Sequence, residues 1–288
     1  MRQTTTPALP ADDPLPDGAA GGPAAARVEA REAGAAAPLV LGPSVPADWL
    51  DIGLPTVAEN LAVDEAILEA AHEGRLSRPV VRTWMAAETT VVVGSSSRID
   101  EEVDRDACRR EGVTILRRPS GGLTVVLGPG CLMWSVIAPL ATATPAIDRI
   151  HSAVLDPLAA ALVATGRPVV RRGSSDLAVV TADGEKKVSG NALRVRRGGV
   201  LYHGTLLDAF DLAVVGRVLR HPPREPAYRA RRDHAAFLAN LGLGRPALEA
   251  AVRLAFAAAN PRTDWPADRV AALVQERYAS LGWTERLG

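Results

Sequence analysis

The stretch DLAVVTADGEKKVSGNALRVRRGGVLYHGTLL, residues 176–207, decides the fold class. It contains three runs typical of strands, at 177–181, 187–195 and 200–207, because each is rich in apolar and β-branched residues. Short turns join the runs at 182–184 and 197–199. Strands joined by such short turns are antiparallel, since a parallel pair needs a crossover of a dozen or more residues. The stretch therefore predicts an antiparallel ribbon.

The rest of the chain surrounds this ribbon with further strands and helices. A helix is expected to begin at Thr56, which forms a capping-box pattern with Glu59, and to end at Gly74. Other helical patterns cover 100–110, 145–165 and the chain from Asp211 onward. Further strand-like runs share short length and β-branched content, and they lie at 80–84, 90–93, 113–116, 124–127 and 132–137. Together they predict an α+β fold with a mixed, largely antiparallel sheet flanked by helices.

Composition excludes several classes of protein. The 288 residues carry 33 basic and 33 acidic side chains, which argues against a dedicated nucleic-acid or anionic-membrane binder. No apolar run reaches the roughly 18 residues of a membrane span. Two cysteines, Cys108 and Cys131, form no disulfide framework, so the expected location is the reducing cytoplasm. Residues 1–46 hold 12 Ala, 8 Pro and 5 Gly and are predicted to be a disordered tail before one folded domain at 47–288.

The lysine count is the most informative part of the composition. The 33 basic residues are 31 arginines and two adjacent lysines, Lys186 and Lys187. Such a bias is typical of GC-rich coding, which replaces lysine codons by arginine codons. A lysine that is kept therefore indicates a position where arginine, with its planar guanidinium, cannot replace the compact ammonium group. A pair of ordinary surface lysines is the alternative interpretation.

Three short motifs have the residue types of a ligand site. Arg117-Arg118-Pro119-Ser120-Gly121-Gly122 follows a strand, and its bare backbone amides beside a guanidinium suit a phosphate or carboxylate. A second close-approach point is Ser189-Gly190 after Lys187, and a third is His203-Gly204-Thr205 within a strand. Asp176 precedes them and suits magnesium or an amine. Taken singly, each motif is as well explained by a charged turn or a hydrogen-bonded core histidine.

In this order and separation, the motifs resemble the lipoate–protein ligase family. The helix Glu59-Asn60-Leu61-Ala62-x-Asp64-Glu65, the run that ends at Gly94 and the ending Glu276-Arg277-Tyr278-x-Ser280-x-x-Trp283 are also similar to that family. The resemblance covers about residues 47–288.

The resemblance implies a fold shared with biotin protein ligases and class II aminoacyl-tRNA synthetases. It implies that lipoate or octanoate reacts with ATP and Mg²⁺ to give an acyl-adenylate, and that a lysine of a carrier domain takes the acyl group. The implied partners are lipoyl domains of 2-oxoacid dehydrogenase E2 or the glycine-cleavage H protein, with no nucleic acid or membrane.

The implied roles fall on residues of the three motifs. Lys187 is the catalytic residue and Asp176 a metal ligand. Arg118 orients phosphate. The expected substrate-binding set is Arg118, Ser120, Gly121, Gly122, Leu123, Thr124, Val125, Ser189, Gly190, Ala192, His203, Gly204 and Thr205.

The sequence also departs from the family pattern, which keeps alternatives open. Leu123 stands where a third glycine is usual, and Ser175 stands where an asparagine precedes the aspartate. A separate C-terminal accessory domain is not expected here, and a second polypeptide could supply it. The alternatives are an octanoyltransferase of the same fold, which needs a nucleophilic cysteine, and a non-catalytic acyl or acyl-carrier binding protein. Cys108 and Cys131 are both expected to have packing roles.

Overall fold

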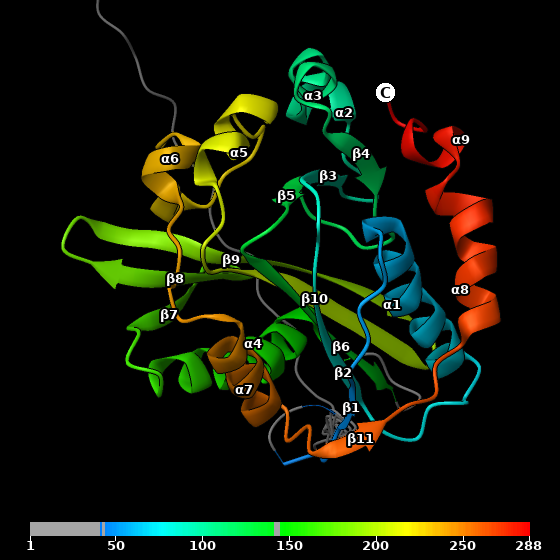
Figure 1. Ribbon diagram of the computed structural model, residues 1–288. Helices are drawn as coiled ribbons and strands as arrows, with labels where there is room; N and C mark the ends of the chain where they lie inside the picture. Colours follow the sequence, from blue (N-terminus) through cyan, green and yellow to red (C-terminus); the bar gives the residue numbers. More distant parts are fainter. Residues whose placement is uncertain (1–40, 42–43, 141–144) are drawn as a thin grey trace, which may run out of the picture. The chain divides into compact units, whose positions relative to one another are not determined.

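A computed structural model describes Leu41, residues 44–140 and residues 145–288, all within one compact unit, Ala36–Gly288. Within these residues the larger sheet has eight strands in the order β11-β1-β2-β6-β10-β9-β8-β7 (Figure 1). The strands are β1 (Asp48–Leu50), β2 (Val80–Met85), β6 (Cys131–Pro139), β7 (Val169–Arg172), β8 (Asp176–Thr181), β9 (Gly184–Arg196), β10 (Gly199–Leu207) and β11 (Asn260–Arg262). Its central pairs are antiparallel and β1 pairs in parallel with β2 and β11, so the predicted α+β class is confirmed.

A smaller sheet lies beside the larger one. Its central strand, β3 (Thr90–Val93), pairs in parallel with β4 (Thr114–Arg117) and antiparallel with β5 (Val125–Leu127). The glycine turn predicted at 117–122 therefore leaves the end of β4 and returns to the opposite edge through β5.

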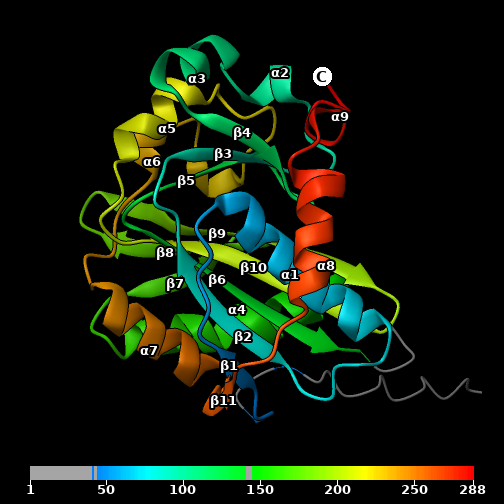
Figure 2. The ribbon, with the colours of Figure 1, turned by 45° about the vertical axis from the view of Figure 1, so that its right-hand side comes forward.

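The described helices pack on the two faces of the large sheet and around the small sheet. They are α1 (Val57–His72), α2 (Ile99–Glu102), α3 (Arg105–Glu111), α4 (Ile147–Val163), α5 (Leu212–Val218), α6 (His234–Phe237), α7 (Arg245–Ala255), α8 (Ala267–Leu273) and α9 (Leu281–Thr284). A π-helical turn, Val274–Tyr278, continues α8. Helix α1 packs on one face, while α4 and α7 pack together on the other (Figure 2).

Strand β6 shows how the sequence divides these two cores. Successive strand side chains point to opposite faces. Cys131, Met133 and Ile137 therefore join the core under α1, whereas Leu132 and Trp134 join the core under α4 and α7. Every residue from Cys131 to Ala138 is buried, as expected for a strand covered on both faces.

Several boundaries follow the sequence, but one predicted helix is wrong. Helix α1 begins after Thr56, and the capping box with Glu59 is formed as predicted. The helix expected at 100–110 is instead the two short helices α2 and α3. Val103 between them is extended and forms an isolated bridge with Leu219, and Asp104 then caps α3 by accepting a hydrogen bond from the amide of Ala107.

The expectation of helices from Asp211 onward is also only partly met. Residues 219–233 hold one short 3₁₀ turn, Ala227–Arg229, and β11 follows α7. The short strands β1 and β7 were not predicted either, because three or four residues carry too little periodicity.

One residue of the predicted tail, Leu41, is described well before the expected start of the domain at 47. Leu41 is 7% exposed and belongs to the core under α4 and α7. Residues 1–40 and 42–43 of the predicted tail lie outside the described residues. Among the described helices, none is long and apolar enough to cross a bilayer.

Candidate active site

A cavity of about 510 Å³ lies where the large sheet meets the small one. Segments that are distant in the sequence share its wall. Most of the predicted site residues line it: Arg118, Gly122, Leu123, Thr124, Val125, Asp176, Lys187, Gly190, Ala192, His203, Gly204 and Thr205. The predicted residues outside the wall are Ser120, Gly121 and Ser189. The three sequence motifs are therefore brought together around one space.

Lys187 lies on β9 beside an irregularity in the sheet. Asp176 of β8 pairs with Gly190, and Ala178 pairs with Lys187, with a shift of register between Leu177 and Ala178. Such bulges re-aim side chains next to active sites. The side chain of Lys187 passes over Gly190, where an added Cβ would lie 3.0 Å from both Cε and Nζ. Gly190 therefore leaves room for the lysine to reach the cavity.

The ammonium group of Lys187 pairs with Asp176. Its Nζ lies 2.8 Å from Oδ1 of Asp176, and the Lys187 side chain is 24% exposed. The Tyr228 hydroxyl donates a hydrogen bond to the other oxygen, Oδ2, at 3.0 Å. Burial, with a further contribution from the charge of Asp176, raises the pKa of Tyr228 well above its ordinary value. Tyr228 therefore stays protonated and keeps donating to the carboxylate.

The surroundings of Asp176 bear on its predicted metal role. Each of its oxygens already accepts a hydrogen bond or an ion pair, one of them from a cation. Among the described residues, no group of three or more His, Cys, Asp or Glu side chains is placed to hold a metal ion. Magnesium usually takes one or two carboxylates plus oxygens of the substrate. Asp176 therefore offers a single carboxylate that is already paired with Lys187, and its role as a metal ligand stays a prediction.

Arg118 organises the glycine turn. Its guanidinium donates to Ser120 Oγ at 3.0 Å and to the carbonyls of Val92, Gly121 and Leu123 at 3.0, 2.6 and 2.8 Å. Burial lowers the pKa of Arg118 to about 10, against an opposing effect of Glu102. Most of its donors are thus used by the protein. Arg118 therefore shapes the turn, and because it also lines the cavity its role in orienting phosphate stays a prediction.

Two glycines, Gly122 in the turn and Gly94 beside it, cannot carry a side chain without strain or a clash. Gly122 has a φ of +86°, which favours glycine. At Gly94, at the end of β3, an added Cβ would lie 1.9 Å from the Gly122 carbonyl oxygen. The loop after β3 and the glycine turn are therefore in direct backbone contact.

A polar chain links this turn to the floor of the cavity. The Ser120 hydroxyl lies 2.6 Å from Nε2 of His203, and Nδ1 of His203 lies 3.7 Å from Asp64. Asp64 in turn pairs with the fully buried Arg82 at 2.9 Å and accepts a hydrogen bond from Ser135. Burial raises the pKa of Asp64, but Arg82 and His203 outweigh it and hold that pKa below its ordinary value. Ser120 therefore anchors the turn to β10.

Two residues that the sequence predictions left out complete the wall. Asp64 belongs to the helix motif Glu59–Glu65, but it was not assigned to the site from the sequence. The feature that could have identified it is an acidic residue within a helical stretch of otherwise mostly apolar, buried residues. Asn191 donates to the Ser175 carbonyl at 2.8 Å. Its side chain lies against Gly204, where an added Cβ would be 1.7 Å from Oδ1. The side chain of Asn191 therefore leaves no room for a residue larger than glycine at position 204.

Apolar side chains form much of the rest of the wall, beside the polar or charged Ser174, Ser175, Arg224 and Glu225. Leu61, Trp84, Val92, Leu127 and Met133 line the 510 Å³ cavity. A smaller cavity of about 140 Å³ adjoins it and shares Lys187 in its wall. Lys187 therefore lies at the junction of two largely apolar spaces, which suits a ligand with a long apolar part and a charged group.

Neither cysteine of the chain lines either cavity. Cys131 is fully buried, and burial raises the pKa of its thiol to about 12. Cys108 on α3 is also buried, and its thiol pKa is raised mainly by burial. Both therefore have the inert, packed environment that the sequence predicts.

Comparison with known proteins agrees with this geometry. Residues 56–246 match the family model described as the lipoyl protein ligase A/B catalytic domain. Octanoyltransferase LipM of Symbiobacterium thermophilum is 28% identical over 268 residues, which cover 82% of this chain and 97% of that protein.

Two solved structures share the fold. A bi-partite lipoate protein ligase of Thermoplasma acidophilum, studied with its E2 lipoyl domain, has a TM-score of 0.72 at 22% identity, covering 84% of this chain and 97% of that one. A lipoate–protein ligase A bound with ATP has a TM-score of 0.70 at 23% identity, covering 85% and 100%. At these identities the structures show the fold alone. Because the family model spans well over half of the sequence, the chain belongs to the lipoyl protein ligase A/B catalytic domain family.

Proposed function

We propose that this protein activates lipoate or octanoate with ATP and transfers the acyl group to a lysine of a lipoyl carrier domain. The observation that carries the proposal is the position of Lys187. Lys187 and the glycine turn line the same largely apolar cavity, which has no cysteine in its wall, and the lysine ammonium pairs there with Asp176. The fold neighbour named as bound with ATP and the neighbour studied with an E2 lipoyl domain support the choice of substrate and carrier.

The first step brings two anions together. A carboxylate oxygen of the acid attacks the α-phosphorus of ATP, a P–O bond forms, and the bond to pyrophosphate breaks. Lys187 stabilises the negative charge that develops, because a preorganised cation in a partly dry site is worth more than in water. For this the ammonium shares its contact with Asp176, which Tyr228 continues to hold in place.

The second step transfers the acyl group. The ε-amine of the carrier lysine attacks the acyl carbon, an amide bond forms, AMP leaves, and the amine gives up its proton. The apolar wall stabilises the acyl chain by about 0.8 kcal/mol per buried methylene. It also shields the mixed anhydride from water until the carrier arrives. Magnesium, expected for the adenylation, would take its ligands mainly from the nucleotide, given the surroundings of Asp176.

The second candidate is an octanoyltransferase, which the similarity to LipM favours. That reaction passes through a thioester on a cysteine, as the family resemblance implies. The two buried cysteines of this chain lie outside the cavity, and the thiol of Cys131 is protonated at neutral pH because its pKa is about 12. The ligase therefore fits the cavity wall better than the transferase does.

The deciding experiment is ATP–pyrophosphate exchange in the presence of lipoate or octanoate. We expect exchange in the wild type and a loss of at least about a hundredfold in Lys187→Ala, the size of one preorganised electrostatic contact. Lys186→Ala is the matched control, because it removes the neighbouring lysine from the same strand and is expected to keep the activity. Intact mass of an apo-lipoyl domain then reports the transfer.

The other two functions give different results in the same experiment. Absence of exchange together with octanoyl transfer from acyl carrier protein, lost in Cys131→Ser, would establish the transferase. Absence of both activities with retained binding of the carrier would establish a non-catalytic binding protein.

A further inference from the structure

We propose that the C-terminal segment Leu281–Gly288 is a positioning element that holds the glycine turn of the cavity in place through Arg117. The inference deepens the proposed function, on which its kinetic part rests. In Figures 1 and 2, α9 lies beside β4, the strand that leads into the turn.

Arg117 and Arg118 contact different parts of the molecule, because they are neighbours at the end of a strand. Adjacent strand side chains point to opposite sides. Arg118 points toward the turn and the cavity, as described above. Arg117 is fully buried on the other side and donates from Nε to the Thr284 carbonyl at 2.9 Å.

The contact between Arg117 and the C-terminal segment runs in both directions. The indole N–H of Trp283 donates to the Arg117 carbonyl at 2.8 Å. The Arg117 guanidinium also donates to the carbonyls of Gly94 and Ser97, both at 2.7 Å. The Ser97 hydroxyl donates to the Gly122 carbonyl at 3.1 Å. A continuous chain of hydrogen bonds therefore runs from Trp283 and Thr284 to a glycine of the cavity wall.

Ionic and stacking contacts hold the segment itself. Glu285 accepts two hydrogen bonds from Arg105 of α3, at 2.9 and 2.7 Å. The guanidinium groups of Arg277 and Arg286 both lie over the ring of Trp283, at 4.6 and 3.9 Å from its centroid. Arg286 also donates to the Ser95 carbonyl in the loop after β3. The segment thus contacts three elements around the turn, while none of its residues lines the cavity.

The test compares Trp283→Phe with Leu281→Ala. Phe keeps an aromatic ring beside the two arginines but cannot donate to the Arg117 carbonyl. Leu281 lies on the same helix and is 78% exposed, so its removal is the matched control. We expect amide hydrogen exchange in 117–124 to rise about fivefold in Trp283→Phe, the effect of losing one hydrogen bond. Exchange in the β8–β9 ribbon should stay at the control's values, and the Tm should fall by only about 2–4 °C, the shift that a loss of about 1 kcal/mol produces in a domain of this size.

The kinetic readout is the KM for ATP in the exchange reaction. It should rise about fivefold in Trp283→Phe with a smaller change in kcat, whereas Leu281→Ala should match the wild type. Unchanged exchange in 117–124, or an equal rise throughout the chain, would overturn the positioning role. Faster exchange confined to 117–124 in a protein whose wild type lacks ATP–pyrophosphate exchange would support that role and contradict only the proposed function.

Discussion

At the scale of single residues, the buried pair of Asp64 and Arg82 lies beneath the cavity and is costly to desolvate. Arg82 has no exposed surface, and burial lowers its pKa despite the opposing charge of Asp64. Removing one member of a buried ion pair leaves the other charge uncompensated. The pair is therefore best understood as a fixed anchor for His203, and through it for Ser120, rather than as a net source of stability.

Asp64→Asn tests this anchor. We expect the free energy of unfolding to fall by about 3–5 kcal/mol, since Arg82 stays buried without a full countercharge. Urea denaturation measures the change, and Asp51→Asn is the control because Asp51 is exposed. A loss within about 0.5 kcal/mol of the control would contradict the expectation.

At the scale of elements, the hairpin β9–β10 was predictable, because the glycine turn at 197–199 and the strand-like runs on both sides of it indicate the same structure. Asp176, Lys187 and His203 could be assigned to adjacent strands from the sequence, and the structure places all three on the cavity wall. The break between α2 and α3 could not be predicted, because it depends on the bridge of Val103 with the distant Leu219. The role of Tyr228 at the site could not be predicted for the same reason, because its hydrogen bond to Asp176 joins residues that are 52 positions apart.

Gly204→Ala tests the packing of β9 against β10. The new methyl group would displace the side chain of Asn191, which holds the Ser175 carbonyl. Overpacking of this kind destabilises by about 1–3 kcal/mol, and we also expect weaker binding of the acyl substrate by calorimetry. Gly216→Ala in α5 is the matched control. Nothing lies within 4 Å of its added methyl, so it should gain about 0.5–1 kcal/mol. Equal effects of the two substitutions would contradict this account.

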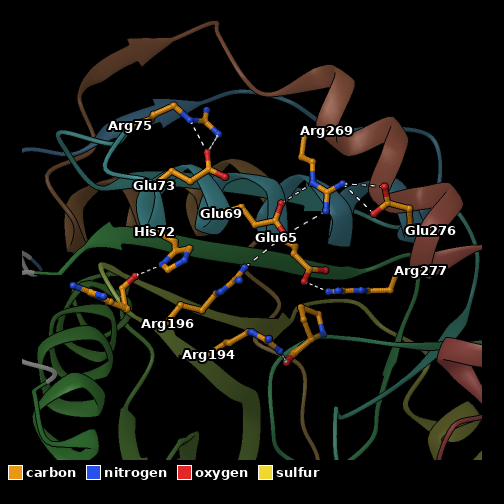
Figure 3. A network of polar contacts seen from close by, with 12 residues as sticks. Glu65, Glu69, His72, Glu73, Arg75, Arg194, Arg196, Arg269, Glu276 and Arg277 are labelled. Carbon is orange, nitrogen blue, oxygen red and sulfur yellow. Dashed lines mark hydrogen bonds and ion pairs between the residues drawn. The ribbon is translucent and has the colours of Figure 1, made fainter.

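At the scale of the whole described unit, an ionic network joins α1 to the C-terminal helices and to β9 (Figure 3). Glu65 is 1% exposed, pairs with Arg277 and accepts a hydrogen bond from Tyr278 at 2.8 Å. Glu69 accepts from Nε of Arg269 at 2.7 Å. The sequence showed the family-like ending around Arg277 and Tyr278, but not that its partners lie on α1, because these pairs are more than 200 residues apart.

The network makes the free energy of unfolding depend on pH, and Glu69→Gln measures the part of this dependence that comes from Glu69. Burial raises the pKa of Glu69, but Arg269 outweighs it, so the folded-state pKa lies below the ordinary 4.5. A lowered carboxyl pKa contributes stability that is present above about pH 4.5 and is lost as the pH falls through the folded value. The unfolding free energy of Glu69→Gln should therefore lie below that of the wild type at pH 7, and the gap should close as the pH falls below 4.5.

The matched control for this titration lies one turn further along the chain, at the C-cap of the same helix. Glu73 pairs with Arg75, but both side chains are more than half exposed, so solvent screens the pair. Urea denaturation of Glu73→Gln should show almost no gap to the wild type at any pH. A Glu69→Gln gap that stayed constant down to acid pH would show lost packing in place of a lost charge. In that case the contact of α1 with α8 would depend on shape, and the ionic network of Figure 3 would not be what joins the C-terminal helices to α1.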